Sequence, residues 1–394
     1  GQANRRLTET QFAWERISER TGHVLKAEFF KHLGATRLAE HKQCQSRILH
    51  FSTVGQKCGI GEYTRHLMAA LRREGAASKL LTSRSPGHEP QLTAEDGDAD
   101  IAWHFDNVTW STTRLFPEIE RRVAAAGMTG AIIQHHPGFL PGADLLRLVD
   151  ACLQSGVAPL TILHAVSDAQ VPLLAELVSR GVLLASHKLS DVKFLQQQSV
   201  AVMHIPLAVA ELPGRLARTS PIDRQAPIIV SNGFLRAHKG FETLLEAFVL
   251  LKQHVPHARL RLLAPDYPSP DSRETLSRLE AVIRAKLLTD CVDLDTRYRE
   301  KQELISEIAK CDIAVFPYGE SAEGGSAAAS DAIACALPVI VSPSRVFDDL
   351  RHVALTVAAE PYALHQAMMS MLDNPSYYSR TSYASFAYAE RQSW

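Results

Sequence analysis

Residues 312–343 read DIAVFPYGESAEGGSAAASDAIACALPVIVSP and predict a strand, a loop, a helix and a second strand. The first strand is the apolar run 313–316, which ends at a proline. The alanine-rich residues 326–336 have helical character, and the apolar run 339–341 follows a Leu-Pro pair. Strand, helix and strand of these lengths are typical of a βαβ unit with parallel strands.

The loop of this unit carries a glycine pair, Gly324 and Gly325, directly before the helix. The first N–H groups of a helix lack partners within the helix, and its dipole is positive at that end. A phosphate is therefore the expected ligand. Glu323 and Asp331 lie eight residues apart, so one carboxylate is in the loop and the other is more than a turn into the helix. An ordinary βαβ unit with acidic residues near its helix terminus is the competing interpretation.

This pattern, Glu-x7-Asp followed by a small-residue helix and a Pro-Val-Ile strand, resembles the Glu-x7-Glu donor-site signature of retaining glycosyltransferase family 4. The second carboxylate is one methylene shorter in this chain. The resemblance implies that Glu323 faces the transferred sugar and that Asp331 holds the nucleotide ribose. It also implies that the backbone of Gly325, Ser326 and Ala327 stabilises the donor diphosphate.

The composition, 46% hydrophobic and 22% charged residues, is typical of a globular protein. A length of 394 residues is sufficient for two domains. A net charge of −1 gives no overall field that would favour nucleic acid. The six cysteines are scattered without a Cys-x2-Cys pair, which favours free thiols in a reducing compartment. No apolar stretch approaches the roughly 18 residues of a membrane span, and the N-terminus lacks a signal-peptide pattern. We expect a cytoplasmic protein, with peripheral contact at the inner face of the membrane left open.

The alternation of strands and helices predicts an α/β fold, and the resemblance makes it two Rossmann-like doubly wound domains facing a central cleft, the GT-B fold. Residues 1–44 lack a strand pattern and are expected to form a helical extension. Their basic excess fits a solvated helix face, a linker to further domains of a larger enzyme, or contact with anionic lipid. The expected divisions after this extension are an N-terminal acceptor domain at 45–210, a linker at 211–227, a nucleotide-sugar domain at 228–372 and a C-terminal helix at 373–394 that packs back on the N-terminal domain.

A second segment supports the resemblance near the start of the fold. Residues 47–53 predict a strand and residues 54–61 a glycine-containing loop before a helix. Gly59-x-Gly61-x-Tyr63 resembles the family's N-domain glycine loop, whose backbone approaches the donor diphosphate. It is not the Gly-x-Gly-x-x-Gly dinucleotide motif, because Thr64 stands at the last position.

Histidines follow two of the predicted strands of the first domain. His164 matches the family's Thr-x-x-His position, which contacts the donor sugar beside the reacting centre. His135 and His136 end another strand, and for them a structural role and a functional role remain equally open.

The third segment is residues 228–240, IIVSNGFLRAHKG, which resembles the family's Gly-Arg-Leu-x-x-x-Lys-Gly segment. Lys239 falls on the diphosphate-binding lysine. Phe234 stands where the family has an arginine, and Arg236, two places on, either supplies the missing cation or is simply solvated. The loop 295–299 resembles the place where the family reads the base through backbone groups, which puts Tyr298 beside the nucleotide.

Two Asp-x-Asp sequences suggest the metal ligands of the other large glycosyltransferase fold, one within Asp96–Asp100 and one at Asp293–Asp295. In the first, glycine among aspartates is typical of a turn. We therefore expect no metal. Motifs of zinc proteases, α/β-hydrolases and P-loop proteins are not found in the sequence.

The resemblance implies a retaining, metal-independent transfer of a hexose from a nucleotide diphosphate sugar to a hydroxyl of a bacterial polysaccharide or lipopolysaccharide glycan, without a further cofactor. Mannose, from GDP-mannose, is favoured because residues 233–240 look most like mannosyltransferase members. A non-catalytic module that binds a sugar nucleotide or a glycan within a larger assembly is the competing class, favoured by the departures Phe234 and Asp331. The expected catalytic residues are Glu323, His164 and Lys239, and the expected donor-binding residues are Gly59, Gly61, Arg236, Lys239, Tyr298, Gly325, Ser326, Ala327 and Asp331.

Overall fold

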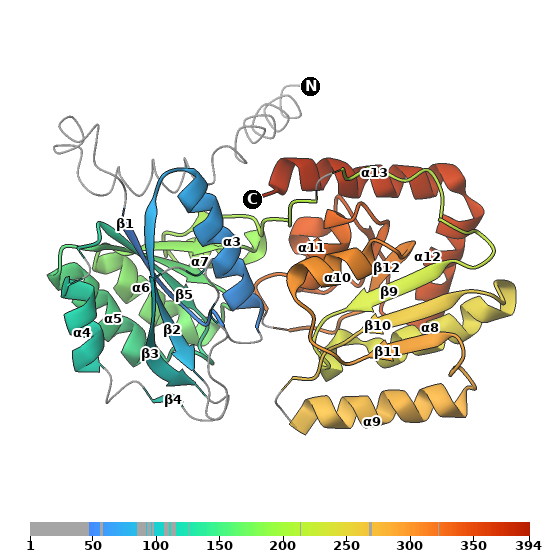
Figure 1. Cartoon of the computed structure of the whole chain (residues 1–394), viewed down its shortest axis with the longest axis horizontal. Helices are drawn as coiled ribbons and strands as arrows, with labels where there is room; N and C mark the ends of the chain where they lie inside the picture. The colour runs from blue at the N-terminus through green and yellow to red at the C-terminus, as the bar shows by residue number, and fades with distance from the viewer. Residues whose placement is uncertain are drawn as a thin grey trace. The chain divides into compact units, whose positions relative to one another are not determined.

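The computed structural model describes residues 47–55, 58–84, 92, 96, 98–105, 110–111, 116–125, 127–212, 214–267, 270–321 and 323–394. The expected helical extension, residues 1–44, lies outside them. The chain divides into two compact units, Gly1–Pro206 with Trp394, and Leu207–Ser393. Each unit contains one sheet flanked by helices (Figure 1).

The sheet of the first unit has eight strands in the order β4-β3-β2-β1-β5-β6-β7-β8, parallel except for the antiparallel pair β3 and β4. Its strands are β1 (Arg47–Ser52), β2 (Ala77–Arg84), β3 (Asp98–Phe105), β4 (Trp110–Ser111), β5 (Gly130–His135), β6 (Ala158–Leu163), β7 (Leu183–Ser186) and β8 (Met203–His204). Its helices are α3 (Gly59–Arg73), α4 (Phe116–Ala125), α5 (Gly142–Gln154), the short η3 (Asp168–Gln170), α6 (Val171–Ser179) and α7 (Leu189–Gln197).

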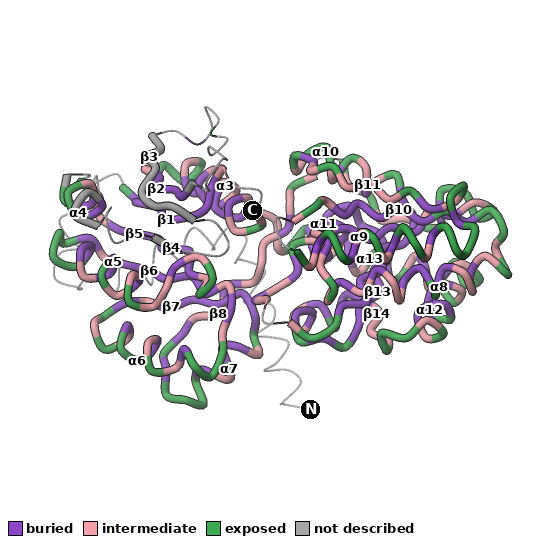
Figure 2. The backbone as a smooth tube through the Cα atoms, turned by 90° about the horizontal axis from the view of Figure 1, so that it is seen from below, coloured by how far each residue is buried: buried purple, intermediate pink, exposed green. Residues whose placement is uncertain are grey.

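The core of this unit follows from the strand sequences. Leu49 and Phe51 of β1 are two residues apart, so their side chains lie on the same face of the strand. On that face they join a buried cluster with helices α4 to α7. Strand β5 is buried at every position, and it is one of the purple strands in Figure 2. A parallel strand covered on both faces reads as a nearly continuous apolar run, which is why sequence alone located these strands.

The sheet of the second unit has six parallel strands in the order β11-β10-β9-β12-β13-β14. They are β9 (Ile228–Asn232), β10 (Arg259–Leu263), β11 (Val292–Asp295), β12 (Ile313–Phe316), β13 (Val339–Val341) and β14 (Leu355–Thr356). The helices are η4 (Ala237–Lys239), α8 (Phe241–His254), α9 (Pro270–Ala285), α10 (Lys301–Ile308), α11 (Ala327–Ala334), η5 (Arg345–Leu350), α12 (Pro361–Asp373) and α13 (Pro375–Gln392).

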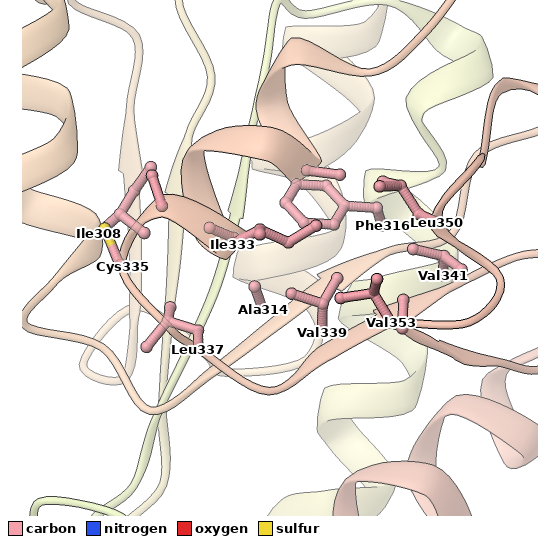
Figure 3. Close-up of a cluster of buried hydrophobic side chains, with 14 of the residues drawn as sticks. Ile308, Ala314, Phe316, Ile333, Cys335, Leu337, Val339, Val341, Leu350 and Val353 are labelled. Atoms are coloured by element: carbon pink, nitrogen blue, oxygen red, sulfur yellow. The ribbon is translucent and has the colours of Figure 1, made fainter. Parts of the chain in front are cut away.

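Two buried clusters cover the two faces of this sheet. One joins β12 and β13 to α10 and α11 around Phe316 and Ile333, as Figure 3 shows. The other joins the sheet to α8, α9 and α12. Helices on both faces of a parallel sheet make it doubly wound. The expected fold class, two Rossmann-like doubly wound domains, is confirmed for the described residues.

The segments around the expected domain boundaries lie as follows. The expected linker 211–227 and helix α13 both belong to the second unit. Within that unit α13 packs against α11 and α12, and Ser382 and Ser385 donate hydrogen bonds from their hydroxyls to the carbonyls of Ala336 and Leu337. Trp394 is grouped with the first unit. The return of the C-terminal helix to the N-terminal domain stays a prediction.

Candidate active site

In each unit the strand order reverses between two central strands, β1 and β5 in the first and β9 and β12 in the second. Open parallel sheets bind ligands at the carboxyl ends of such a pair, because the connections leave in opposite directions there. In the second unit, the segments that follow β9 and β12 carry Lys239 and Glu323. Two of the three residues expected to be catalytic therefore lie at this switch point.

Lys239 and Glu323 form an ion pair in the structure. The Lys239 ammonium donates to both carboxylate oxygens, with Nζ 3.1 Å from Oε1 and 2.8 Å from Oε2. The lysine side chain is 9% exposed and the glutamate side chain 38%. The same ammonium lies 4.1 Å from the centre of the buried Tyr318 ring, a cation–π geometry. The pair is thus a preformed site of opposite charges, open to solvent on the glutamate side.

The backbone around Lys239 explains why it is held so close to β12. Gly240 follows it with a left-handed φ of 68°, and a Cβ at this position would lie 2.1 Å from the Pro317 carbonyl oxygen. No side chain fits there. The tight turn brings the end of η4 against the end of β12, and the Gly319 N–H donates to the His238 carbonyl at 2.8 Å.

Opposing effects set the protonation of this pair. Burial would raise the pKa of Glu323, but the hydrogen bond from His238 and the charge of Lys239 outweigh burial and lower that pKa to about 2. Burial would lower the pKa of Lys239, but the interactions with Tyr318 and Glu323 raise it overall. Both groups are consequently charged at neutral pH.

His238 is a contact that sequence analysis missed. Its Nε2 lies 3.0 Å from Glu323 Oε1, and an ionised carboxylate can only accept, so the imidazole donates. The available sequence signal was its place directly before Lys239.

Asp331 lies on α11 and is also paired. Lys301, the first residue of α10, donates to its two carboxylate oxygens at 2.9 and 3.0 Å. Burial raises the pKa of Asp331, and the charge of Lys301 opposes this. Lys301 belongs to no motif of the sequence, so no local signal marked it.

The loop before α11 has the local structure expected of a helix start. Ser326 is the N-cap, and its hydroxyl oxygen accepts from the Ala329 N–H at 3.2 Å. Ala327 is the first residue of the helix. A Cβ on Gly325 would meet Leu207 at an ordinary 3.5 Å, so packing within the unit does not require glycine there. Phosphate binding by this backbone stays a prediction.

Arg236 does not lie free in solvent. Its Nε donates to Asp271 at 2.8 Å, and its guanidinium lies 5.0 Å from the Tyr267 ring centre. Phe234 contacts Tyr267 edge-on at 5.3 Å and lies nearly parallel to Tyr298, with 6.4 Å between ring centres. These rings follow β9, β10 and β11 at the carboxyl edge. The role of Arg236 as second cation and that of Tyr298 at the base remain predictions.

In the first unit, the predicted C-terminal end of the glycine-containing loop is wrong. Helix α3 begins at Gly59, inside the loop predicted for residues 54–61, because Cys58 caps it and accepts from the Gly61 N–H at 3.4 Å. A Cβ on Gly61 would lie 2.8 Å from the Thr53 carbonyl oxygen, whereas one on Gly59 would meet nothing within 4 Å. Gly61 is therefore required for packing of the helix against the strand end, whatever it contributes to a ligand.

His164 follows β6 and lies among aromatic and imidazole rings. Its Nε2 is 2.7 Å from Gln134 Oε1, and its ring centre is 5.6 Å from that of Tyr63 and 5.2 Å from that of His187. Burial, followed by the neighbouring histidines, holds the pKa of His164 well below its usual value. Since the amide oxygen accepts, Nε2 carries the proton of a neutral ring and Nδ1 remains an acceptor.

The other two histidines have structural contacts. His135 is fully buried, its Nε2 lies 3.4 Å from the Gln170 amide nitrogen, and burial lowers its pKa to about 4. His136 Nδ1 accepts from the Gly138 N–H at 3.1 Å. These contacts favour the structural role for both residues.

The aspartates of the Asp-x-Asp segments whose side chains the structure describes are paired with arginines, whereas the side chains of Asp98 and Asp100 lie outside the described part. Arg65 binds both oxygens of the buried Asp96, at 2.9 and 3.1 Å. Asp293 is paired with Arg261, and Asp295 accepts from two arginines, Arg297 and Arg299. Within the part of the chain that the structure describes, no group of three or more His, Cys, Asp or Glu residues could hold a metal ion.

Residues 215–388, a little under half of the chain, match the family described as Glycosyl transferases group 1, and this segment contains Lys239, Glu323 and Asp331. No curated protein sequence matches the chain. Among the helices that the structure describes, none combines the length and hydrophobicity of a membrane span.

Solved structures share the fold at low identity. Sucrose-phosphate synthase from Thermosynechococcus elongatus is 17% identical, with a TM-score of 0.66 over 88% of this chain and 95% of that one. Anabaena HepE, in complex with UDP and glucose, is 13% identical, with a TM-score of 0.66 and the same coverage. A UDP-forming α,α-trehalose-phosphate synthase from Burkholderia vietnamiensis is 13% identical, with a TM-score of 0.60 over 89% of this chain and 95% of that one. The family match covers most of the second unit, and the solved structures show that the fold is shared.

Proposed function

We propose that the chain is a glycosyltransferase that moves a hexose from a nucleotide diphosphate sugar to a hydroxyl group. The observation that carries the proposal is the ion pair between Lys239 and Glu323. It lies at the switch point between β9 and β12 and within the segment that matches the group 1 glycosyltransferases.

The leaving diphosphate accumulates negative charge, which a fixed cation stabilises best when it needs no reorganisation. Lys239 is such a cation, because burial and the Tyr318 ring hold its ammonium in place. Binding of the diphosphate has to displace the Glu323 carboxylate from the ammonium. The freed carboxylate then orients hydroxyls of the sugar, whose reacting carbon becomes positively charged as the bond breaks.

His164 suits contact with a sugar because its neutral, half-buried imidazole keeps Nδ1 as an acceptor without introducing a charge. We propose that it acts on the donor sugar, that the anomeric configuration is retained, and that no metal ion takes part. The paired aspartates described above are consistent with the last point.

We propose Asp331 as the ribose contact and Tyr298 as a neighbour of the base. For the hexose two donors compete. Residues 233–240 favour mannose from GDP-mannose, whereas the similar HepE structure is a complex with UDP and glucose. The proposed acceptor is a bacterial polysaccharide or lipopolysaccharide glycan.

Thermal unfolding with a panel of nucleotides and nucleotide sugars, including UDP, GDP, UDP-glucose and GDP-mannose, tests the proposal. A ligand at about 100 times its dissociation constant stabilises the folded state by about 2.7 kcal/mol, which raises the melting temperature of a unit of this size by roughly 5–10 °C. Donor hydrolysis without acceptor is then measured with each compound that binds.

The panel has three outcomes. A shift accompanied by release of the sugar supports the transferase. A shift without hydrolysis or transfer indicates the non-catalytic sugar-nucleotide module instead. If no nucleotide raises the melting temperature, the proposed function is wrong.

A further inference from the structure

We propose that Lys301 is a positioning residue that determines specificity for ribose, by holding the Asp331 carboxylate in the orientation that accepts both hydroxyls of the nucleotide ribose. The inference rests on the proposed function, since it concerns the nucleotide of the same site. It assigns a role to a residue that lies outside every motif of the sequence.

The contact between the two side chains is close to symmetric. Lys301 Nζ lies 2.9 Å from Asp331 Oδ1 and 3.0 Å from Oδ2. Each carboxylate oxygen has two lone pairs, so the ammonium leaves one on each oxygen for another donor. The 2′ and 3′ hydroxyls of a ribose present two such donors side by side. A carboxylate fixed on one side by an ammonium is therefore shaped for a vicinal diol.

Burial makes Asp331 dependent on Lys301. The aspartate side chain is 7% exposed and the lysine side chain 20%, and the helix around Asp331 consists of small buried residues such as Ala329 and Ala332. An uncompensated carboxylate there would take up a proton and lose an acceptor. A buried ion pair adds little net stability compared with apolar residues of the same size. Stability alone therefore does not account for the pair.

The position of the pair in the fold connects it to the proposed nucleotide site. Lys301 begins α10, directly after the loop that follows β11 and contains Tyr298. Asp331 lies in the second turn of α11, whose preceding loop contains Glu323. Both helices start at the carboxyl edge of the sheet, where doubly wound folds bind nucleotides. The two helices are packed together where the Sγ of Cys335 lies 3.5 Å from the carbonyl oxygen of Ile305.

The short side chain of Asp331 gives Lys301 a specific task. An aspartate carboxylate lies one C–C bond, about 1.5 Å, nearer to its own backbone than a glutamate carboxylate does. It has fewer rotatable bonds with which to find the ribose, so its orientation depends on its partner. Lys301, reaching from a neighbouring helix, supplies that orientation.

Titration calorimetry with UDP and 2′,3′-dideoxy-UDP, or the matching guanosine pair if GDP binds better, tests the inference. We expect the unmodified protein to bind the ribonucleotide at least tenfold more tightly than the dideoxy form. Lys301→Met should weaken ribonucleotide binding about tenfold while changing dideoxynucleotide binding less than threefold. Lys301→Arg should retain most of the discrimination, because a guanidinium can bind both carboxylate oxygens.

Lys310→Met is the matched control, since Lys310 is an exposed lysine of the same unit, paired with Glu307, and should leave both affinities unchanged. If Lys301→Met unfolds because Asp331 is left unpaired, the double variant Lys301→Met/Asp331→Asn removes both charges. It should fold and bind the two nucleotides equally.

The outcomes separate this inference from the proposed function. Equal loss of both affinities in Lys301→Met, or discrimination that survives in Lys301→Met or in the double variant, overturns the inference and leaves the transferase in place. So does a wild-type protein that binds both nucleotides equally. A wild-type protein that binds neither nucleotide nor any nucleotide sugar overturns the proposed function as well.

Discussion

Replacing Glu323 with glutamine should affect nucleotide binding and turnover in opposite directions. In the structure the Glu323 carboxylate accepts a hydrogen bond from the Lys239 ammonium at 2.8 Å. A diphosphate therefore competes with this carboxylate for the same cation. Glutamine removes the competing charge while keeping nearly the same shape. The variant should bind a nucleoside diphosphate at least as tightly as the unmodified protein does.

The size of this effect follows from the exposure of the pair. Two charges 4 Å apart near a protein surface interact by about 4 kcal/mol before solvation costs. Because Glu323 is 38% exposed, solvent screening reduces the net value toward the 0.2–1 kcal/mol typical of exposed pairs. A gain of about 1 kcal/mol corresponds to roughly fivefold tighter binding. Turnover should fall by about 10²-fold or more, the usual cost of losing a group that acts on developing charge.

Calorimetric titration with UDP and GDP gives the affinity, and release or transfer of the sugar gives the turnover. Glu320→Gln is the matched control, because Glu320 is an exposed glutamate of the same loop and should change neither quantity. Normal turnover of Glu323→Gln, or nucleotide binding weakened tenfold or more, would refute the reasoning that places the diphosphate on Lys239 and the sugar at Glu323.

Four further outcomes are expected. Lys239→Ala should lower turnover at least about 10²-fold without changing the circular dichroism of the protein, and a near-normal rate contradicts its role. Gly240→Ala should lower the free energy of unfolding in urea by at least about 1–2 kcal/mol because of its left-handed φ. The loss should exceed that of Gly214→Ala, where the φ is similar but a Cβ meets nothing within 4 Å. Equal losses would rule out a collision between the new alanine side chain and Pro317. Burial lowers the pKa of His50 to about 3, so the stability that the neutral ring contributes is complete above the unfolded pKa of about 6.5 and falls by about 2 kcal/mol as the pH drops to 5. His50→Leu should remove that loss, which melting curves at pH 7.5 and 5.0 would show. If the variant is as sensitive to acid as the unmodified protein, His50 is not the cause. Activity should persist in excess EDTA, and complete loss restored by Mn²⁺ would restore the Asp-x-Asp interpretation.

The strand and helix positions could be predicted because their signals are local. The apolar runs 313–316 and 339–341 predicted β12 and β13 at their observed bounds, since parallel strands covered on both faces need such runs. The start of α3 could not be predicted, because a cysteine side chain rather than one of the usual capping residues accepts from the first turn. The sequence marks Gly61 as part of a glycine-containing motif. The structure adds that a Cβ at this position would lie too close to the Thr53 carbonyl oxygen.

Local patterns in the sequence were sufficient to predict the alternation of strands and helices, the two doubly wound domains, and Lys239 and Glu323 as site residues. Which charges pair with one another depends on the tertiary structure. Lys239 and Glu323 are 84 residues apart, and Lys301 and Asp331 are 30 apart. Pairs of this kind form because crossover connections bring the segments that follow different parallel strands to one edge of the sheet. The periodicity of a single helix or strand carries no information about that edge, since it depends on the strand order of the whole sheet.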